Sequence, residues 1–517
     1  MRYTPNTITR REAVSRLAGL AAGCAVGGRT MALAPEPPQR PLNVLFINSD
    51  QQRFDALSCA GSTIVSTPNL DRLAREGVRF SSAYTPSPVC VPARAAFMTG
   101  LSIHTSRCIT RPTDPGMQFG SGTFDQNLVK HGYAAEYHGR WHSPMELTDC
   151  YANEVTLKFI EPYRRYLATT TGNKPETKPG QFVEEIGAWP YTPDAADFDL
   201  RTSQNNPPPH GVKGVRYGID ESPADQTYSA FVANETIAAL ERNRDKPFSI
   251  TAAFLSPHHP MTVTRSFAEQ VDPSKMQMPT TLRDQRLNTP YEKWVWQMDE
   301  TDMAALSVLQ ARYYALVQEV DHHVGRILDS LDRLGLSENT LVIFISDHGE
   351  FMGDHGLMQK FLPYRESVRV PMLMRLPGRI PPGKVVDSVT NTRDLMETIF
   401  DYLELPTPEQ EGHSLRPLVN GQSGYPEYTT SECGEGEGGY VLLATRDWKY
   451  VWTLSATQPD LLFDLNEDPQ ELNNLLGSNP KRGDYLERAC KLRTTLLEWM
   501  ESMNHPCRDR LAQAEIA

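Results

Sequence analysis

The sequence predicts an α/β protein in which helices flank a large mixed, mostly parallel sheet, with a smaller C-terminal α+β domain. The first observation is that short apolar runs, typical of buried strands, alternate with helical patterns between about residues 41 and 400. The second is a change after about residue 400 to shorter apolar segments, at 440–443 and 448–452, followed by a helical pattern. We therefore expect one domain over residues 35–400 and a second over residues 401–517.

The expected elements of the first half have local reasons. Residues 44–47 are an apolar run and predict the first buried strand. Thr67 and Pro68 open a helix, since proline is favoured in the first helical turn. Thr123 and Gln126 have the spacing of a capping box, which predicts a helix that ends near Gly132.

The second half adds two helices and one long irregular stretch. Ser222 and Pro223 open a helix with apolar residues directed to the core. Apolar residues recur at helical spacing over residues 313–334 and predict the longest helix, which stops at Gly335 and leads into a strand at 341–345. Between about 150 and 215 the chain is rich in proline, asparagine, threonine and glycine, which predicts an irregular insertion.

The first 34 residues resemble a twin-arginine export signal. Arg10 and Arg11 precede an apolar run at 17–26, and Ala32 and Ala34 offer small residues for cleavage. The alternative is an amphipathic N-terminal helix. We expect an exported, periplasmic or extracellular protein. We expect no membrane span, because no apolar run approaches the roughly 20 residues that a bilayer requires.

The charge balance restricts the partners. The chain has 51 lysine and arginine residues against 64 aspartate and glutamate residues, a formal net charge of −13. Such an acidic chain is not expected to bind nucleic acid, and a negatively charged substrate would require a local basic pocket. The cysteines outside the leader form no CxxC pair, and the sequence does not select one disulfide connectivity among them.

One short motif places a cysteine at the start of a helix. Cys90 is followed by Pro92 and Arg94, and the residues up to Gly100 read as a short helix closed by glycine. The N-terminus of a helix carries partial positive charge and favours an anion. The alternative is a buried structural cysteine beside a turn.

Chemically active residues follow four of the expected strands. Each of them alone has an ordinary interpretation, such as a turn cap or a satisfied loop histidine. In an open parallel sheet, however, ligands bind beyond the carboxyl ends of the strands, so residues from distant parts of the chain should meet at one edge. These residues are Asp50 and Gln51, Arg140 and His142, His258 and His259, and Asp347 and His348.

The residue types indicate two kinds of binding. Asp50, Gln51, Asp347 and His348 provide mostly oxygen ligands and one imidazole, a set suited to Ca²⁺, Mg²⁺ or Mn²⁺. Arginine and lysine side chains suit a tetrahedral oxyanion. We therefore expect Arg94, Arg140 and Lys360 to form the basic pocket, although long cationic side chains are commonly surface residues.

Together these residues resemble the formylglycine-dependent sulfatases of the alkaline phosphatase superfamily. The resemblance runs from about residue 41 to at least 474 and implies an alkaline-phosphatase-like fold, with the catalytic domain over residues 35–400. The matching stretches are 43–51, 67–71, 90–100, 132–142, 257–260, 346–350, 355–371 and 463–469.

The resemblance also implies a cofactor and a role for each residue. A formylglycine-generating enzyme would oxidise Cys90 to formylglycine during maturation, and the hydrate of this aldehyde would be the nucleophile. The metal, most simply Ca²⁺, would be held by Cys90 and the residues Asp50, Gln51, Asp347 and His348. Arg94 would steady the hydrate, His142 would serve the collapse of the covalent intermediate, and Lys360 with His258 would hold the sulfate and the leaving-group oxygen. Arg140, His355 and His259 would be further substrate-binding residues, with His259 as the alternative to His258.

Three departures from the family pattern concern the subclass. Arg140 stands where lysine is usual, Gln51 replaces a common second aspartate, and Val91 and Ala93 replace small or hydroxylic residues beside Cys90. The expected reaction is hydrolysis of a sulfate ester, on a sulfated carbohydrate or a small alkyl or aryl sulfate. The alternatives are a phosphonate or phosphate ester hydrolase with the same machinery, and a non-catalytic protein that binds sulfated glycans.

Overall fold

The computed structural model describes residues 41–151, 217–220, 223–282, 291, 295, 300–436 and 438–516. The expected export signal and nearly all of the expected insertion at 150–215 lie outside these residues. The described residues contain no helix that is both long enough and apolar enough to span a membrane. Their cysteines are all free thiols.

A large mixed sheet forms the centre of the fold, with the strand order β10-β2-β9-β7-β1-β5-β3 and β8 paired to β2. Strands β7, β1, β5 and β3 run parallel to one another, and β10 runs parallel to β2. Strand β9 is antiparallel to both of its neighbours, so the expected mostly parallel sheet is confirmed. The strands are β1 (Asn43–Asp50), β2 (Val78–Tyr84), β3 (Ala134–Gly139), β5 (Phe248–Pro257), β7 (Thr340–Ser346), β8 (Arg369–Val370), β9 (Met372–Arg375) and β10 (Lys384–Asn391).

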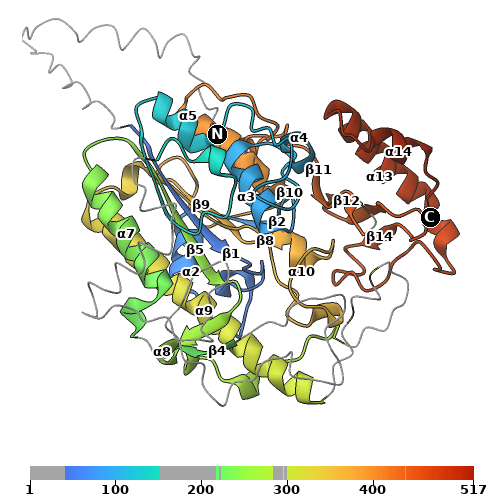
Figure 1. Cartoon of the computed structure of the whole chain (residues 1–517), viewed down its shortest axis with the longest axis horizontal. Helices are drawn as coiled ribbons and strands as arrows, with labels where there is room; N and C mark the ends of the chain where they lie inside the picture. The colour runs from blue at the N-terminus through green and yellow to red at the C-terminus, as the bar shows by residue number, and fades with distance from the viewer. Residues whose placement is uncertain are drawn as a thin grey trace, which may run out of the picture. The chain divides into compact units, whose positions relative to one another are not determined.

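Helices cover both faces of this sheet (Figure 1). Side chains alternate along a strand, so Val44 and Phe46 of β1 join one apolar core while Leu45 and Ile47 join another. The first core includes residues of α3 (Cys90–Thr99), α5 (Phe124–Lys130) and α11 (Leu395–Leu403). The second includes residues of α2 (Pro68–Glu76), α7 (Tyr228–Asn243) and α9 (Glu300–Arg333).

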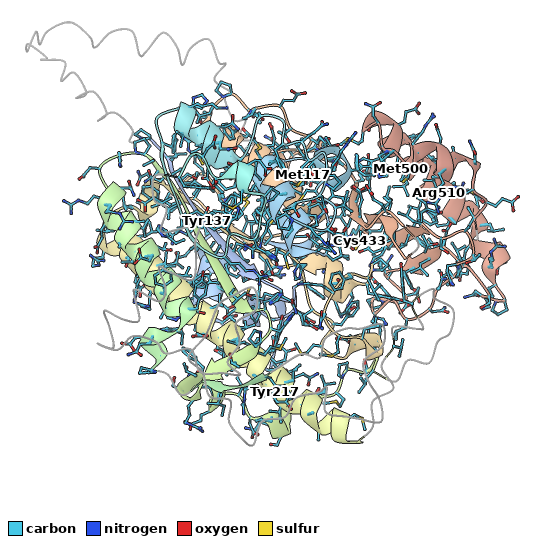
Figure 2. The ribbon with its side chains drawn as sticks, viewed as in Figure 1. Met117, Tyr137, Tyr217, Cys433, Met500 and Arg510 are labelled. Atoms are coloured by element: carbon cyan, nitrogen blue, oxygen red, sulfur yellow. The ribbon has the colours of Figure 1, made fainter. Side chains whose placement is uncertain are left out.

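The C-terminal part is a four-stranded antiparallel sheet with helices against it, as Figure 1 shows and as Met500 and Arg510 mark in Figure 2. Leu443 and Leu496 belong to the core between this sheet and α13. Leu442 joins a separate core with Phe351 and Tyr364, from the segment that carries Lys360. The smaller sheet therefore packs against the segment that carries Lys360. Its elements are β11 (Tyr428–Cys433), β12 (Tyr440–Thr445), β13 (Trp448–Thr453), β14 (Leu461–Asp464), α13 (Arg482–Ser502) and α14 (Arg508–Gln513).

Short elements complete the described chain. Strands β4 (Tyr217–Asp220) and β6 (Met261–Thr264) pair in parallel and pack with α9, with Tyr217 labelled in Figure 2. The short α-helices are α4 (Ile103–Ser106), α8 (Arg265–Ala268), α10 (Arg365–Val368) and α12 (Arg416–Val419). The 3₁₀ turns are η1 (Ser58–Ala60), η2 (Met145–Leu147), η6 (Ala224–Gln226), η7 (Pro273–Lys275), η9 (Ser337–Asn339), η10 (Asp354–Gly356) and η11 (Thr392–Asp394).

Local signals located most helix ends. The capping box is confirmed, because Thr123 accepts from the backbone N–H of Gln126 and the Gln126 side chain accepts in return. The helix expected to open at Ser222 is wrong in its start. A 3₁₀ turn comes first, and α7 begins at Tyr228 because Thr227 provides the cap by accepting from the backbone N–H of Ala230.

Candidate active site

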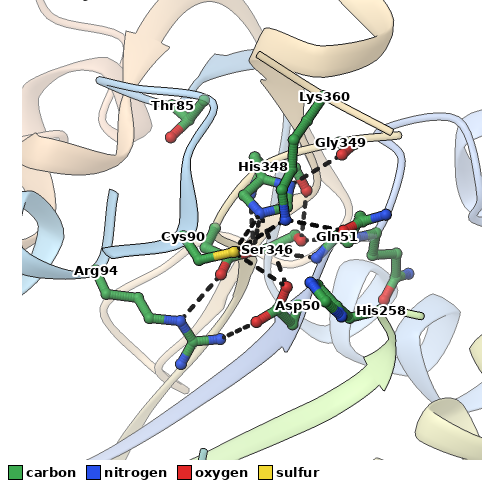
Figure 3. A network of polar contacts seen from close by, with 12 residues as sticks. Asp50, Gln51, Thr85, Cys90, Arg94, His258, Ser346, His348, Gly349 and Lys360 are labelled. Carbon is green, nitrogen blue, oxygen red and sulfur yellow. Dashed lines mark hydrogen bonds and ion pairs between the residues drawn. The ribbon is translucent and has the colours of Figure 1, made fainter. Parts of the chain in front are cut away.

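The residues that follow β1, β5 and β7 lie together beside Cys90 at the start of α3 (Figure 3), and Arg140, which follows β3, contacts Asp50 of the same group. Strand β1 ends in Asp50, β3 leads to Arg140, β5 leads to His258, and β7 leads to Asp347. Strand register explains this convergence, because β1 pairs with both β5 and β7 along its length. The expected meeting of these segments at the carboxyl ends of the strands is observed.

Cys90 is the first residue of α3 and is only 4% exposed. Its Sγ lies 3.0 Å from Nε2 of His348, 3.0 Å from Nζ of Lys360 and 3.8 Å from Oδ1 of Asp50. Burial alone raises the pKa of the thiol, but the positive charges of Lys360 and His348 outweigh burial and lower the pKa well below its usual value. The electrostatic environment therefore favours an anionic group at this position.

Four side chains are grouped as metal ligands would be. One ligand atom from each of Asp50, Cys90, Asp347 and His348 lies within 4.8 Å of the others, and all four residues are buried. Nδ1 of His348 lies 3.0 Å from the carbonyl oxygen of Gly349. A hydrogen on Nδ1 donates to that carbonyl, and loss of the proton on Nε2 when a cation binds would leave a lone pair there directed at the cluster. Two carboxylates and this imidazole fit a divalent cation with oxygen-rich coordination.

The two carboxylates of the cluster differ electrostatically. Burial alone raises the pKa of Asp50, but the charges of Arg140, His258 and Arg94 outweigh it and hold the pKa well below the usual range. Burial raises the pKa of Asp347, and the nearby charge of Asp50 raises it further. A divalent cation between the two groups would relieve their repulsion.

Arg94 lies beneath the carboxylates and is completely buried. Its Nε donates to Oδ2 of Asp347 at 3.0 Å, and its Nη2 donates to Oδ2 of Asp50 at 2.9 Å, as Figure 3 shows. Its Nη1 donates to the carbonyl oxygen of Arg140 at 2.8 Å. Arg94 is absent from the described residues that line the cavity above. It holds the acids in place from behind.

A cavity of about 680 Å³ opens above Cys90. Lys360 and Arg140 line its wall as expected, and Arg111 adds a third cation that sequence reasoning did not single out. Arg111 belongs to a loop in which Asp114 accepts hydrogen bonds from three successive backbone N–H groups, those of residues 109–111. This clustering of cations suits a tetrahedral oxyanion. The lining consists of Val89, Cys90, Val91, Thr110, Arg111, Pro112, Thr113, Arg140, Trp141, His142, His258, His259, Gln359, Lys360 and Phe361.

Arg140 reaches this wall because of the glycine before it. Gly139 has φ of +109°, and a Cβ at this position would lie 2.0 Å from the carbonyl oxygen of Ala253 on the neighbouring strand. Only glycine therefore allows the end of β3 to approach β5 so closely and then turn. Arg140 itself is buried, with Nη1 3.3 Å from Oδ2 of Asp50.

The histidines of the cavity have distinct environments. Nη2 of Arg140 lies 2.8 Å from Nδ1 of His142. Arginine can only donate, so the neutral ring of His142 carries its hydrogen on Nε2 and acts as a donor there. Burial lowers the pKa of His258 to about 4, and the charge of Lys360 contributes to the shift. His259 lines the same cavity, and burial with the charge of His258 lowers its pKa well below the usual value.

The structure does not bring His355 to the cavity. Its ring stacks on Tyr364 with centroids 4.4 Å apart, and its Nε2 lies 3.5 Å from Oε2 of Glu366. The chain turns through positive φ at Gly353 and at His355, which directs this imidazole to the core side of the segment. Its expected role as a substrate-binding residue is therefore not supported by its position.

Glu350 is a site residue whose role the sequence analysis missed. It is completely buried and accepts a hydrogen bond from Nε2 of Gln51. On the other side of that amide, Nζ of Lys360 donates to Oε1 of Gln51 at 3.0 Å. A carboxylate directly after the Asp-His-Gly run was the available signal, but only the fold places it behind Gln51.

The chain matches two protein-family models. The Sulfatase family model matches residues 42–405, and the model described as N-sulphoglucosamine sulphohydrolase, C-terminal, matches residues 353–496. The chain is 30% identical to the arylsulfatase of Clostridium perfringens (strain 13 / Type A), with coverage of 89% of this chain and 94% of that protein. It is also 30% identical to the choline-sulfatase of Rhizobium meliloti (strain 1021), with coverage of 85% and 83%.

The fold has solved counterparts. The crystal structure of the phosphonate monoester hydrolase of Agrobacterium radiobacter superposes with a TM-score of 0.71 at 24% identity and covers 90% of this chain and 96% of that one. This likeness establishes the architecture. With the match of the family model over most of the chain, and with the site described above, it leads to one conclusion: the chain belongs to the sulfatase family, the sulfuric ester hydrolases of the alkaline phosphatase superfamily.

Proposed function

We propose that this chain hydrolyses the sulfate ester of a sulfated carbohydrate or a small alkyl or aryl sulfate, with formylglycine at position 90 and a divalent cation, most simply Ca²⁺. The single observation that carries the proposal is the contact of Cys90 with both parts of the site. Its Sγ lies 3.0 Å from Nζ of Lys360 and within the cluster formed with Asp50, Asp347 and His348. The side chain proposed as the nucleophile thus contacts both the proposed metal ligands and Lys360, which is proposed to bind the sulfate.

The proposed chemistry divides between the bound groups and the chain. A formylglycine hydrate would supply two hydroxyls on one carbon, one to attack sulfur and the other to expel sulfate when it loses its proton and the aldehyde reforms, and a divalent cation would lower the pKa of the attacking hydroxyl. Asp50, Asp347 and His348 would hold the cation, with Oε1 of Gln51 as a further ligand. Arg94 keeps the two aspartates oriented and reduces their repulsion.

The cavity wall would bind the substrate. Lys360 and His258 are assigned to the sulfate and the leaving-group oxygen, since both line the cavity above Cys90. Arg140 and His259 would contact the remaining oxygens. His142 donates at Nε2, so the collapse-step role expected from the resemblance would require its ring hydrogen to move, and the contact with Arg140 opposes that move.

The cavity and the relatives support the substrate class. A volume of about 680 Å³ holds a sugar or an aryl group together with the sulfate, within the common range of small-molecule sites. Among the similar proteins are one named arylsulfatase, one named choline-sulfatase and one named N-acetylglucosamine-6-O-sulfatase.

The maturation and the location of the protein are part of the proposal. A formylglycine-generating enzyme would act on Cys90 before the segment is buried, since the folded residue is 4% exposed. The twin-arginine pattern supports export to the periplasm or the cell exterior. Mass spectrometry of the peptide that contains Cys90, after co-expression with such an enzyme, should show an aldehyde in place of the thiol. An intact thiol would favour the alternative of a non-catalytic glycan-binding protein.

Kinetics would separate the ester classes. We expect higher kcat/KM on an aryl sulfate than on the matching aryl phosphonate or phosphate ester, and loss of turnover in Cys90→Ala and in Lys360→Ala. Preference for the phosphorus ester would replace the proposal with the phosphonate or phosphate hydrolase. Full activity of either variant would reject the role given to that residue.

A further inference from the structure

The amide of Gln51 is held at both ends. Gln51 is completely buried, and Lys360 donates to its Oε1 at 3.0 Å, as Figure 3 shows. At the opposite end, its Nε2 donates to Oε2 of Glu350. The two ends of an amide have nearly the same shape, but only the oxygen can coordinate a cation. The orientation of this side chain therefore decides whether it can serve the metal cluster.

The carboxyl group of Glu350 is held in place by hydrogen bonds from the backbone. Its side chain is completely buried, and its Oε1 accepts the backbone N–H groups of Met352 at 3.0 Å and Gln359 at 2.5 Å. Its Oε2 accepts from Nε2 of Gln51, and this contact orients the amide with its oxygen on the side away from Glu350. Gln359 directly precedes Lys360, so one carboxylate anchors both the amide and the backbone that carries the cation.

An uncharged amide at position 51 suits the neighbouring carboxyl group of Glu350 better than a second carboxylate would. A carboxylate at position 51 would face the buried carboxylate of Glu350, and two like charges in contact away from water are costly. The amide instead converts the contact into a hydrogen bond. Gln51 and Glu350 thus form one hydrogen-bonded pair, in which the carboxyl group belongs to Glu350 and not to the residue that faces the metal cluster.

We propose that Glu350 is a positioning residue that fixes the amide of Gln51 with Oε1 towards Lys360 and the cation site. This role rests on the proposed function, in which the cluster of Asp50, Asp347 and His348 binds a divalent cation. Glu350 does not contact substrate or cation in this assignment. It acts through Gln51.

The substitution Glu350→Gln tests the assignment because it reverses the amide without removing the backbone contacts. The new Oε1 would still accept the N–H groups of Met352 and Gln359, so its nitrogen would point at Gln51. Gln51 would then turn its own oxygen to that nitrogen and present N–H groups to the cation. We expect Ca²⁺ affinity, measured by calorimetry on the full chain with unmodified Cys90, to fall about 10- to 100-fold.

The reversed pair Gln51→Glu/Glu350→Gln distinguishes positioning from simple structural support. In this variant the carboxylate at position 51 accepts from the amide at position 350, and either of its two equivalent oxygens can face the cation. We expect Ca²⁺ affinity no more than about threefold below that of the wild type, because the bond between positions 51 and 350 is kept with its direction reversed and the bonds from Met352, Gln359 and Lys360 are kept as they are. Glu136→Gln, at a buried glutamate outside the candidate metal clusters, is the control and should leave Ca²⁺ affinity unchanged.

The outcomes separate this role from the proposed function. Wild-type Ca²⁺ affinity in Glu350→Gln, or equally weak binding in the single variant and the reversed pair, would overturn the role of Glu350. Failure of the wild type to bind Ca²⁺, Mg²⁺ or Mn²⁺ would instead reject the cation chemistry of the proposed function. In that case the thermal stability of the metal-free proteins tests the orientation of the Gln51 amide. In Glu350→Gln, Gln51 would turn its N–H groups towards Lys360, which should lower the unfolding midpoint. Only the reversed pair should regain the wild-type unfolding midpoint. Equal unfolding midpoints for Glu350→Gln and the wild type would overturn the role of Glu350.

Discussion

Replacing Arg94 by methionine should strongly destabilise the protein, because it removes the charge that balances two buried acids. Arg94 donates to Asp347 at 3.0 Å and to Asp50 at 2.9 Å, and all three side chains are completely buried. Removing one partner from a buried ion pair costs about 3–5 kcal/mol, since the remaining charge is left without compensation. We therefore expect Arg94→Met to lower the free energy of unfolding of the metal-free protein by about 3–5 kcal/mol.

Urea unfolding provides the assay, with the shift of the midpoint multiplied by a common slope. Arg242→Met is the matched control. Arg242 pairs with Glu136 but its side chain is 46% exposed, so its loss should cost about 1 kcal/mol or less. Adding Asp347→Asn to Arg94→Met should recover part of the loss, because it removes one uncompensated charge. A cost for Arg94→Met no larger than that of the control, or no recovery in the double variant, would refute the reasoning.

Three further predictions concern the fold around the site. Asp125 is buried, and burial raises its pKa to about 7, so the folded state binds more protons than the unfolded state between about pH 4 and 7 and loses stability as the pH rises. The stability of Asp125→Asn relative to the wild type should therefore rise by about 3 kcal/mol from pH 5 to pH 8 in urea titrations, since the difference grows by about 1.4 kcal/mol per pH unit up to about pH 7. Parallel curves would contradict this. Gly139→Ala should lower the unfolding free energy by about 4 kcal/mol or more and reduce turnover, because the new Cβ would lie 2.0 Å from a strand carbonyl oxygen. Gly132→Ala, whose Cβ would have no neighbour within 4 Å, is the control and should lower the unfolding free energy much less. Thr123→Ala should lower the unfolding free energy by about 1 kcal/mol through loss of the cap on α5, and an unchanged midpoint would reject that contribution.

Much of the fold followed from local pattern. The run at residues 44–47 became a strand whose side chains alternate between two cores, as its apolar character indicates for a strand buried on both faces. The capping box at Thr123 was read correctly because both partners lie within one helical turn. The start of α7 was misplaced because Pro223 opens a 3₁₀ turn, and Thr227, four residues later, is the residue that caps the helix.

The chemistry of the site was predictable where it followed strand ends. Asp50 and Asp347 were expected together because parallel strands deliver their carboxyl ends to one edge, and they are found in one cluster. The position of His355 was not predictable, because nothing in its neighbourhood indicates that the chain turns its ring onto Tyr364. Glu350 was overlooked because its partner Gln51 lies 299 residues away in the sequence.

The sequence by itself determined which chemistry was available: a cysteine at a helix start, acids and an imidazole after strands, and cations near them. These signals are local, because propensity, capping and strand periodicity depend on neighbours within a few residues. Tertiary structure alone decided the assignment of each group, such as Arg94 behind the acids and Arg140 against His142. The physical reason is that burial, charge compensation and hydrogen-bond direction depend on which distant segments meet, and only the packed sheet establishes that.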